Sequence, residues 1–144
     1  RHRFTLIIIL GKENGGKHTA LNVGIRTIHT ELTMIVDSDD RLLPNAVNDI
    51  CKTHRKYSNN GDIGVYSFLR CYSNGKPVVS LEAEEFVDSY VKYRIKENRP
   101  GDMAEVFKTP VLKEFPFPEF QGERFLSEDV VWIQIGFKVS ICFY

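Results

Sequence analysis

The sequence predicts an α/β domain, in which a mixed sheet is flanked by helices. Two apolar runs rich in β-branched residues, over residues 4–10 and 32–36, are typical of strands inside a sheet. Between them, apolar residues recur at helical spacing over residues 17–29, so strand, turn, helix and strand follow one another as in a βαβ unit. With 144 residues, 42% of them apolar and 26% charged, residues 1–144 are expected to form one domain.

The rest of the chain continues this alternation of helical and strand-like patterns. Helices are predicted over residues 44–57, 84–95 and 110–114, and again after Ser127. Strands are predicted over residues 63–72, 77–80, 103–108 and 138–144, the first two joined by a turn at 73–76. Loops are predicted at residues 97–102 and 115–120, the latter because alternate prolines remove backbone donors and fix φ.

Composition and charge exclude several classes of protein. Basic and acidic residues balance at 19 each, so no global positive field favours a nucleic-acid partner. The longest apolar run, residues 6–10, is too short to cross a bilayer, and residues 1–3 do not lead into a signal peptide. Cys51, Cys71 and Cys142 are odd in number and widely spaced, which favours a reducing compartment. We expect a cytoplasmic protein without a transmembrane segment, with a peripheral position at the inner face of the membrane as an open alternative.

Three carboxylates, Asp37, Asp39 and Asp40, follow the apolar run at residues 32–36. Like charges this close repel one another unless a cation or a hydrogen-bonding ligand lies among them. In open α/β sheets, ligands bind beyond the carboxyl ends of the strands. A solvated turn in which Asp39 or Asp40 caps the next helix would explain one carboxylate, whereas three favour a divalent metal site.

The glycine-rich turn before the first helix nearly fits a phosphate-binding loop. Gly11, Gly16 and Lys17 match the pattern G-x-x-x-x-G-K-[ST], and a strand that ends in Asp37 resembles the metal-holding partner strand. The match fails at His18, because magnesium requires Ser or Thr at this position. A P-loop phosphotransferase therefore remains a minority alternative.

Three segments of the chain together resemble a known family. They are Glu13-Asn14-Gly15-Gly16-Lys17 with residues 20–25, Val36-Asp37-Ser38-Asp39-Asp40 with Leu43-Pro44, and Phe117-Pro118-Glu119 leading to Ser127-Glu128-Asp129. In this order, with about 90 residues between the two acidic clusters, they resemble glycosyltransferase family 2. The resemblance implies a nucleotide-sugar-dependent enzyme with the GT-A fold, a Rossmann-like mixed sheet flanked by helices.

The resemblance assigns roles to the acidic residues. Asp37 and Asp39 resemble the acids of the D-x-D motif: Asp37 would lie near the nucleotide ribose or the metal, and Asp39 would hold Mn²⁺ or Mg²⁺ on the diphosphate. Glu128 and Asp129 resemble the acidic pair that supplies the catalytic base, with Asp129 preferred and Glu128 as its rival. Without the resemblance, a helix capped by Ser127 with acids in its first turn is a sufficient explanation for both residues.

Lys17 and Asn14 are the candidates for contact with the donor phosphates. Lys17 would lie at the start of a helix, where anions bind favourably, although a solvated surface lysine is an equally good explanation. The implied reaction moves a sugar from a nucleotide diphosphate sugar, most commonly a UDP-sugar, to a glycan or polysaccharide acceptor. An inverting transfer needs a base for the acceptor hydroxyl and a cation for the departing diphosphate.

The resemblance also implies that the fold is partial. Roughly the first 50 to 60 residues of the usual domain, which hold its nucleotide-binding half, have no counterpart here, judged by the length of a βαβ unit. An exposed sheet edge would then favour weak donor binding, self-association or both. A truncated member that binds glycan without turnover is the third alternative.

Overall fold

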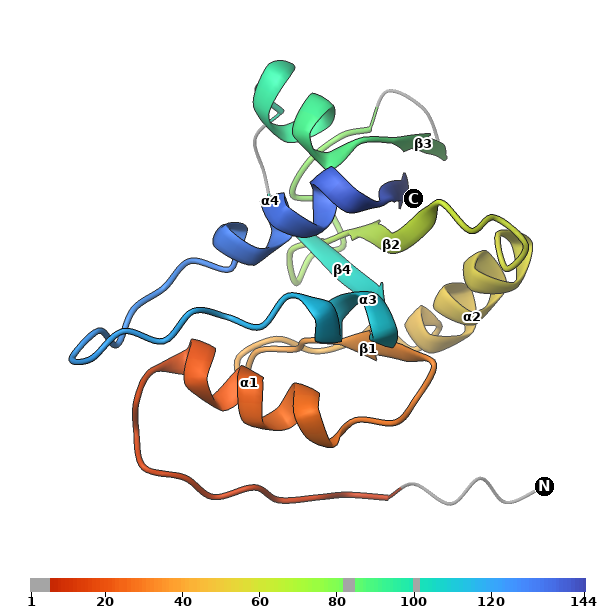
Figure 1. Ribbon diagram of the computed structural model, residues 1–144. Coiled ribbons are helices and arrows are strands. Elements are labelled where there is room, and N and C mark those ends of the chain that lie inside the picture. The colour runs from red at the N-terminus through yellow and green to blue at the C-terminus, as the bar shows by residue number, and fades with distance from the viewer. Residues whose placement is uncertain (1–5, 82–84, 100–101) are drawn as a thin grey trace.

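The computed structural model describes residues 6–81, 85–99 and 102–144, and its strands form one open sheet (Figure 1). The strands are β1 (Leu32–Met34), β2 (Ile63–Leu69), β3 (Phe86–Asp88), β4 (Met103–Lys108) and β5 (Ser140–Phe143). The sheet order is β1-β4-β2-β5-β3. β4 is antiparallel to both β1 and β2, β5 is parallel to β2, and β3 is antiparallel to β5. The prediction of an α/β chain with a mixed sheet is confirmed.

Helices cover both faces of this sheet. They are α1 (Lys17–Thr27), α2 (Ala46–Lys56), the π-helix η1 (Val91–Lys96), α3 (Thr109–Glu114) and α4 (Asp129–Lys138). Successive residues of a strand point to opposite faces, and in β2 Val65 and Tyr66 belong to two different apolar clusters. The cluster around Val65 includes residues of α1, α3, α4 and η1, whereas the cluster around Tyr66 includes Ile50 of α2. No helix among the described residues is long and apolar enough to span a membrane.

Most predicted elements are present, with shorter bounds. α1, α2, α4, β1, β2, β4 and β5 all lie inside the ranges expected from the sequence. The turn at residues 73–76 is closed by hydrogen bonds from Tyr72 N to Lys76 O at 2.9 Å and from Gly75 N to Tyr72 O at 2.8 Å. The returning strand predicted over residues 77–80 is reduced to one bridge, between Cys71 and Pro77.

The strand predicted over residues 4–10 is wrong for the described part, residues 6–10. These residues are extended but belong to no sheet, and their exposed fractions run from 45% at Leu10 to 90% at Ile9. Residues 4 and 5 lie outside the described residues. β-branched composition favours a strand only where a neighbouring edge supplies hydrogen bonds, and no strand of the described residues pairs with this segment. The predicted βαβ unit is therefore not formed among the described residues.

The helix predicted over residues 84–95 is also wrong as a single element, and residue 84 lies outside the described residues. Phe86–Asp88 instead joins the sheet as β3, and only Val91–Lys96 is helical, as η1. The ring of Phe86 stacks on that of Phe143 in β5, with centroids 4.9 Å apart. Pairing with β5 therefore overrides the local helical pattern.

The irregular segment at residues 115–120, predicted from its prolines, is fixed by one buried side chain of α1. Asn22 Nδ2 donates to Phe117 O at 2.8 Å and to Glu119 Oε1 at 2.7 Å, while Asn22 Oδ1 accepts from Phe117 N at 2.9 Å. This segment leads to α4, so the hydrogen bonds of Asn22 connect α1 to the part of the chain that precedes α4.

Candidate functional site

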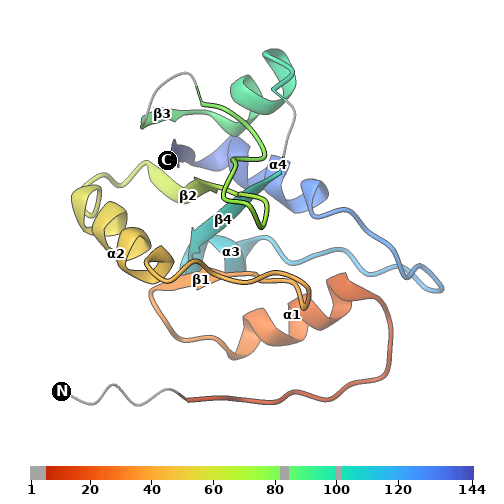
Figure 2. The same cartoon turned by 180° about the vertical axis from the view of Figure 1, so that it is seen from behind.

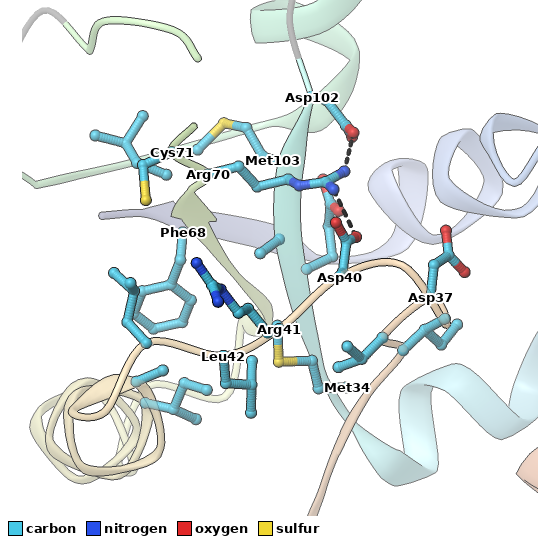
Figure 3. A pocket seen from close by; sticks show the side chains of 18 of the residues that line it. Met34, Asp37, Asp40, Arg41, Leu42, Phe68, Arg70, Cys71, Asp102 and Met103 are labelled. Carbon is cyan, nitrogen blue, oxygen red and sulfur yellow. Dashed lines mark hydrogen bonds and ion pairs between the residues drawn. The ribbon is translucent and has the colours of Figure 1, made fainter. Parts of the chain in front are cut away.

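The polar residues of the candidate site meet at one edge of the sheet. Because β4 is antiparallel to both β1 and β2, the carboxyl ends of β1 and β2 lie beside the amino end of β4. Asp40 follows β1, Arg70 follows β2 and Asp102 precedes β4, and Figure 3 shows them facing one another. Together with Glu128 beside α4, they line an open groove of about 1790 Å³.

Lys17 brings the two predicted acidic clusters together. Its Nζ lies 2.6 Å from Asp37 Oδ1 and 2.6 Å from Glu128 Oε1, and it donates to Asp37 Oδ2 at 2.8 Å. Burial lowers the pKa of Lys17, but its hydrogen bonds to Asp37 and Glu128 outweigh this and raise the pKa above the ordinary value. A charged ammonium group thus joins the loop after β1 to the start of α4.

Arg70 forms a second bridge of the same kind. Its guanidinium contacts Asp40 Oδ2 at 2.5 Å and also pairs with Asp102 (Figure 3). The sequence prediction did not single out Arg70 or Asp102. The available signal was position, since Arg70 stands at the carboxyl end of a predicted strand, where ligands collect in α/β sheets.

Asp39 differs from the acids on either side of it. It is exposed, and within the described residues it makes no hydrogen bond or ion pair. Residues 6–81, 85–99 and 102–144 contain no group of three or more His, Cys, Asp or Glu side chains that could hold a metal. Mg²⁺ commonly uses one or two carboxylates together with water and substrate phosphates, so the exposed Asp39 fits as a donor without a complete protein cage, whereas both oxygens of Asp37 contact Lys17.

Asn14 shapes the turn before α1. Its side-chain oxygen accepts the Gly16 N–H at 3.0 Å, so that oxygen is already used within the turn. Gly16 has φ 94, and a Cβ there would lie 2.2 Å from Arg124 O. This close packing fixes the backbone of the turn and therefore the point from which the Lys17 side chain extends.

The two acids at the start of α4 have different partners. Glu128 pairs with Lys17, whereas Asp129 Oδ1 accepts a hydrogen bond from the Tyr90 hydroxyl at 3.0 Å. Burial and the nearby Asp129 carboxylate both raise the pKa of Tyr90, which therefore remains a donor. Ser127 is not the cap residue: Glu128 holds that position, without a capping side-chain bond, and Ser127 Oγ accepts from Asp129 N at 3.4 Å. The two carboxylates of the predicted pair are thus held by different groups.

Glu105 is a site residue that the sequence prediction missed. It alternates with Met103 and Phe107 along β4, so it faces the same side of the sheet as these buried apolar residues. Its side chain is 13% exposed and lines the groove, with Arg94 Nη2 3.9 Å from its Oε1. Burial raises the pKa of Glu105 to about 7. A carboxylate at an inward strand position was the signal that could have revealed it.

This raised pKa predicts a stability difference that depends on pH. Folding favours protonated Glu105, so the stabilisation is fully present below the ordinary pKa of 4.5 and is lost as pH rises through about 7. Glu105→Gln stays uncharged and avoids this loss. The free energy of unfolding of Glu105→Gln minus that of wild type should therefore increase by about 2 kcal/mol when the pH is raised from about 5 to about 8. This figure allows for water at the groove mouth.

Denaturant titrations of both proteins at several pH values measure this gap. Glu13→Gln, the same substitution at an exposed position, is the control. A gap between wild type and Glu105→Gln that stays constant with pH would contradict the raised pKa.

A scan against models of known protein families matches none of them, and a search of curated proteins finds no significant match. The likeness to glycosyltransferase family 2 therefore depends on the three sequence motifs alone.

Proposed function

We propose that this chain carries the catalytic groove of a metal-dependent glycosyltransferase with a GT-A-type fold. It would transfer a sugar from a nucleotide diphosphate sugar, a UDP-sugar as first choice, to a glycan or polysaccharide acceptor with inversion at the anomeric carbon. The observation that carries the proposal is the Lys17 bridge, with Asp37 and Glu128 both 2.6 Å from its ammonium. Asp37 and Glu128, about 90 residues apart in the sequence, both line one groove, which supports a shared role for the two acidic clusters.

Asp37 and Asp39 would hold Mn²⁺ or Mg²⁺ at the mouth of the groove. Such an ion, when bound, stabilises the negative charge that develops on a departing diphosphate. Carboxylate oxygens suit these hard cations, and the exposed Asp39 carboxylate is available without breaking an ion pair.

Asp129 is the first choice for the catalytic base. It would take the proton of the acceptor hydroxyl while the new bond to the anomeric carbon forms and the bond to the diphosphate breaks. Its bond from the neutral Tyr90 hydroxyl orients the carboxylate, and no cation within the part of the chain that the structure describes forms an ion pair with it. Glu128 remains the rival, because it lines the groove and Asp129 is not among the lining residues, but Glu128 would have to give up its ion pair with Lys17 to accept a proton.

The P-loop alternative gains no specific support from the structure. Residues 6–10 do not place a sheet strand before the glycine-rich turn, and Lys17 is engaged by carboxylates. His18 takes the place of the required hydroxyl residue and is 2% exposed. A P-loop phosphotransferase is therefore only one possible outcome of the nucleotide-binding test described next.

Mn²⁺ titrations in the presence of UDP or ATP test the proposed function. Melting temperature and the fluorescence of Trp132, which lines the groove, report binding. We expect Mn²⁺-dependent stabilisation by UDP and not by ATP, weakened at least about tenfold in Asp39→Asn because a metal donor is lost. Asp39 is exposed and unpaired among the described residues, so this substitution leaves the fold intact.

Asp62→Asn is the matched control. Asp62 is also exposed but precedes β2, at the opposite end of the sheet from the groove. Stabilisation by ATP alone would favour the phosphotransferase. A lack of response to either nucleotide would contradict donor binding by this chain and favour the non-catalytic glycan-binding alternative.

A further inference from the structure

Residues 6–10 form the longest run of exposed large apolar side chains among the described residues. The sequence is Leu-Ile-Ile-Ile-Leu, and the exposed fraction is 59% at its centre, Ile8, and 90% at Ile9. A short segment of high β-propensity without charge or proline readily adds to an open sheet edge. This segment therefore has the composition of a strand but pairs with no strand among the described residues.

β1 offers such an edge. Among the described strands it pairs only with β4, and Thr109 N donates to Glu31 O at 3.0 Å just before β1. Hydrogen-bonded and non-hydrogen-bonded pairs alternate in antiparallel strands, so the backbone groups of Leu32 and Met34 point away from β4. Thr30 Oγ1 covers the Leu32 carbonyl at 2.9 Å, which leaves the outward groups of Met34 open.

The segment does not reach this edge within its own chain. Figures 1 and 2 both show α1 between residues 6–10 and β1. α1 is held in place by Asn22, which is hydrogen-bonded to Phe117, and by contacts with α3. Strand addition within the chain would therefore require α1 to move.

We propose that residues 6–10 of one chain add as a strand to the β1 edge of a second copy, which donates its own segment in return. The five apolar residues 6–10 are long enough to lie along the three residues of β1 and the two that follow it, of which Val36 is 44% exposed. Reciprocal exchange gives a closed two-fold dimer in which both segments are covered. This interface does not depend on the proposed function.

The full chain is tested by light scattering after size-exclusion chromatography over a range of micromolar concentrations. We expect twice the chain mass of 16.6 kDa for wild type. Ile8→Pro should weaken the dimer at least about tenfold, because proline removes a donor from the centre of the added strand. Ile8 is exposed and lies in no helix or strand, so the monomer should keep its far-UV circular dichroism.

Two further variants make the test specific. Phe125→Pro places the same substitution in an irregular segment at a residue that is 82% exposed, and it should leave the dimer intact. Met34→Pro removes an outward N–H from the receiving edge while sparing the bonds to β4. An equal mixture of Ile8→Pro and Met34→Pro should recover part of the dimer, since one intact segment can still meet one intact edge.

Three results would overturn the proposal. A monomeric wild type at every concentration would exclude the exchange, and a dimer that survives Ile8→Pro would place the interface elsewhere. A monomeric wild type that loses melting temperature in Ile8→Pro would show that the segment pairs within its own chain.

Discussion

Asn22→Ala is expected to lower the free energy of unfolding by about 2 to 4 kcal/mol. Asn22 is 4% exposed, and its amide makes hydrogen bonds to both the carbonyl oxygen and the N–H of Phe117. Truncation leaves these two backbone groups without a partner at a residue that is 2% exposed. A buried polar group left unsatisfied costs more than the net gain of an ordinary hydrogen bond, which makes the expected loss large.

Denaturant unfolding of wild type and variant measures this loss. Asn48→Ala is the matched control because Asn48 lies exposed on α2, where the same substitution should change stability by only about 0.5 kcal/mol or less. Equal changes at the two positions would contradict a structural role for the bonds of Asn22 to Phe117.

The elements predicted correctly are those whose signal is local. The helical spacing of apolar residues located α1, α2 and α4, and alternate prolines marked the irregular segment at residues 115–120. The metal-site prediction for Asp37 and Asp39 uses a signal that is equally local, carboxylates that follow a predicted buried strand, and it stays a prediction. In each case a few neighbouring residues carry the whole signal.

The elements predicted wrongly depend on partners far away in the sequence. Phe86–Asp88 becomes a strand only because β5, formed some fifty residues later, offers an edge and Phe143 stacks on Phe86. Residues 6–10 have stronger strand composition but pair with no strand in the part of the chain that the structure describes. Strand formation is a property of a pair of segments, so one segment's composition does not decide it.

The candidate site also depends on contacts between segments that are far apart in the sequence. The sequence identified Lys17 as a candidate for phosphate contact, but the meeting of Asp37 and Glu128 at its ammonium depends on how α1 and α4 pack. Arg70 and Glu105 were missed because each is a single charged residue in a strand region, and their importance comes from neighbours contributed by other elements.

Lys17→Met is expected to bind Mn²⁺ about tenfold more tightly than wild type in the absence of nucleotide. The ammonium lies 2.6 Å from Asp37 Oδ1, so it occupies an oxygen proposed for the metal and repels a second cation. The side chain is 46% exposed, so solvent screening keeps the effect well below that of a buried charge. Isothermal titration with Mn²⁺ alone measures the change.

UDP should reverse the direction of this effect. If Lys17 contacts the donor phosphates, its removal weakens UDP binding at saturating Mn²⁺ by about tenfold, as expected for the loss of a charged hydrogen bond. The same substitution then strengthens one ligand and weakens the other, a combination that general destabilisation does not produce. Melting curves without ligand show whether the bridge to Glu128 also stabilises the fold.

Lys12→Met is the control that separates a local from a general charge effect. Lys12 precedes α1 and bonds to Thr19 Oγ1 at 2.7 Å, and among the described residues it makes no ion pair with either acidic cluster. If Lys12→Met tightened Mn²⁺ binding as much as Lys17→Met, the gain would come from net charge alone. If Lys17→Met left Mn²⁺ affinity unchanged while Asp39→Asn abolished it, Asp39 would serve the metal without Asp37, and the Lys17 bridge would be a tether between the β1 loop and α4.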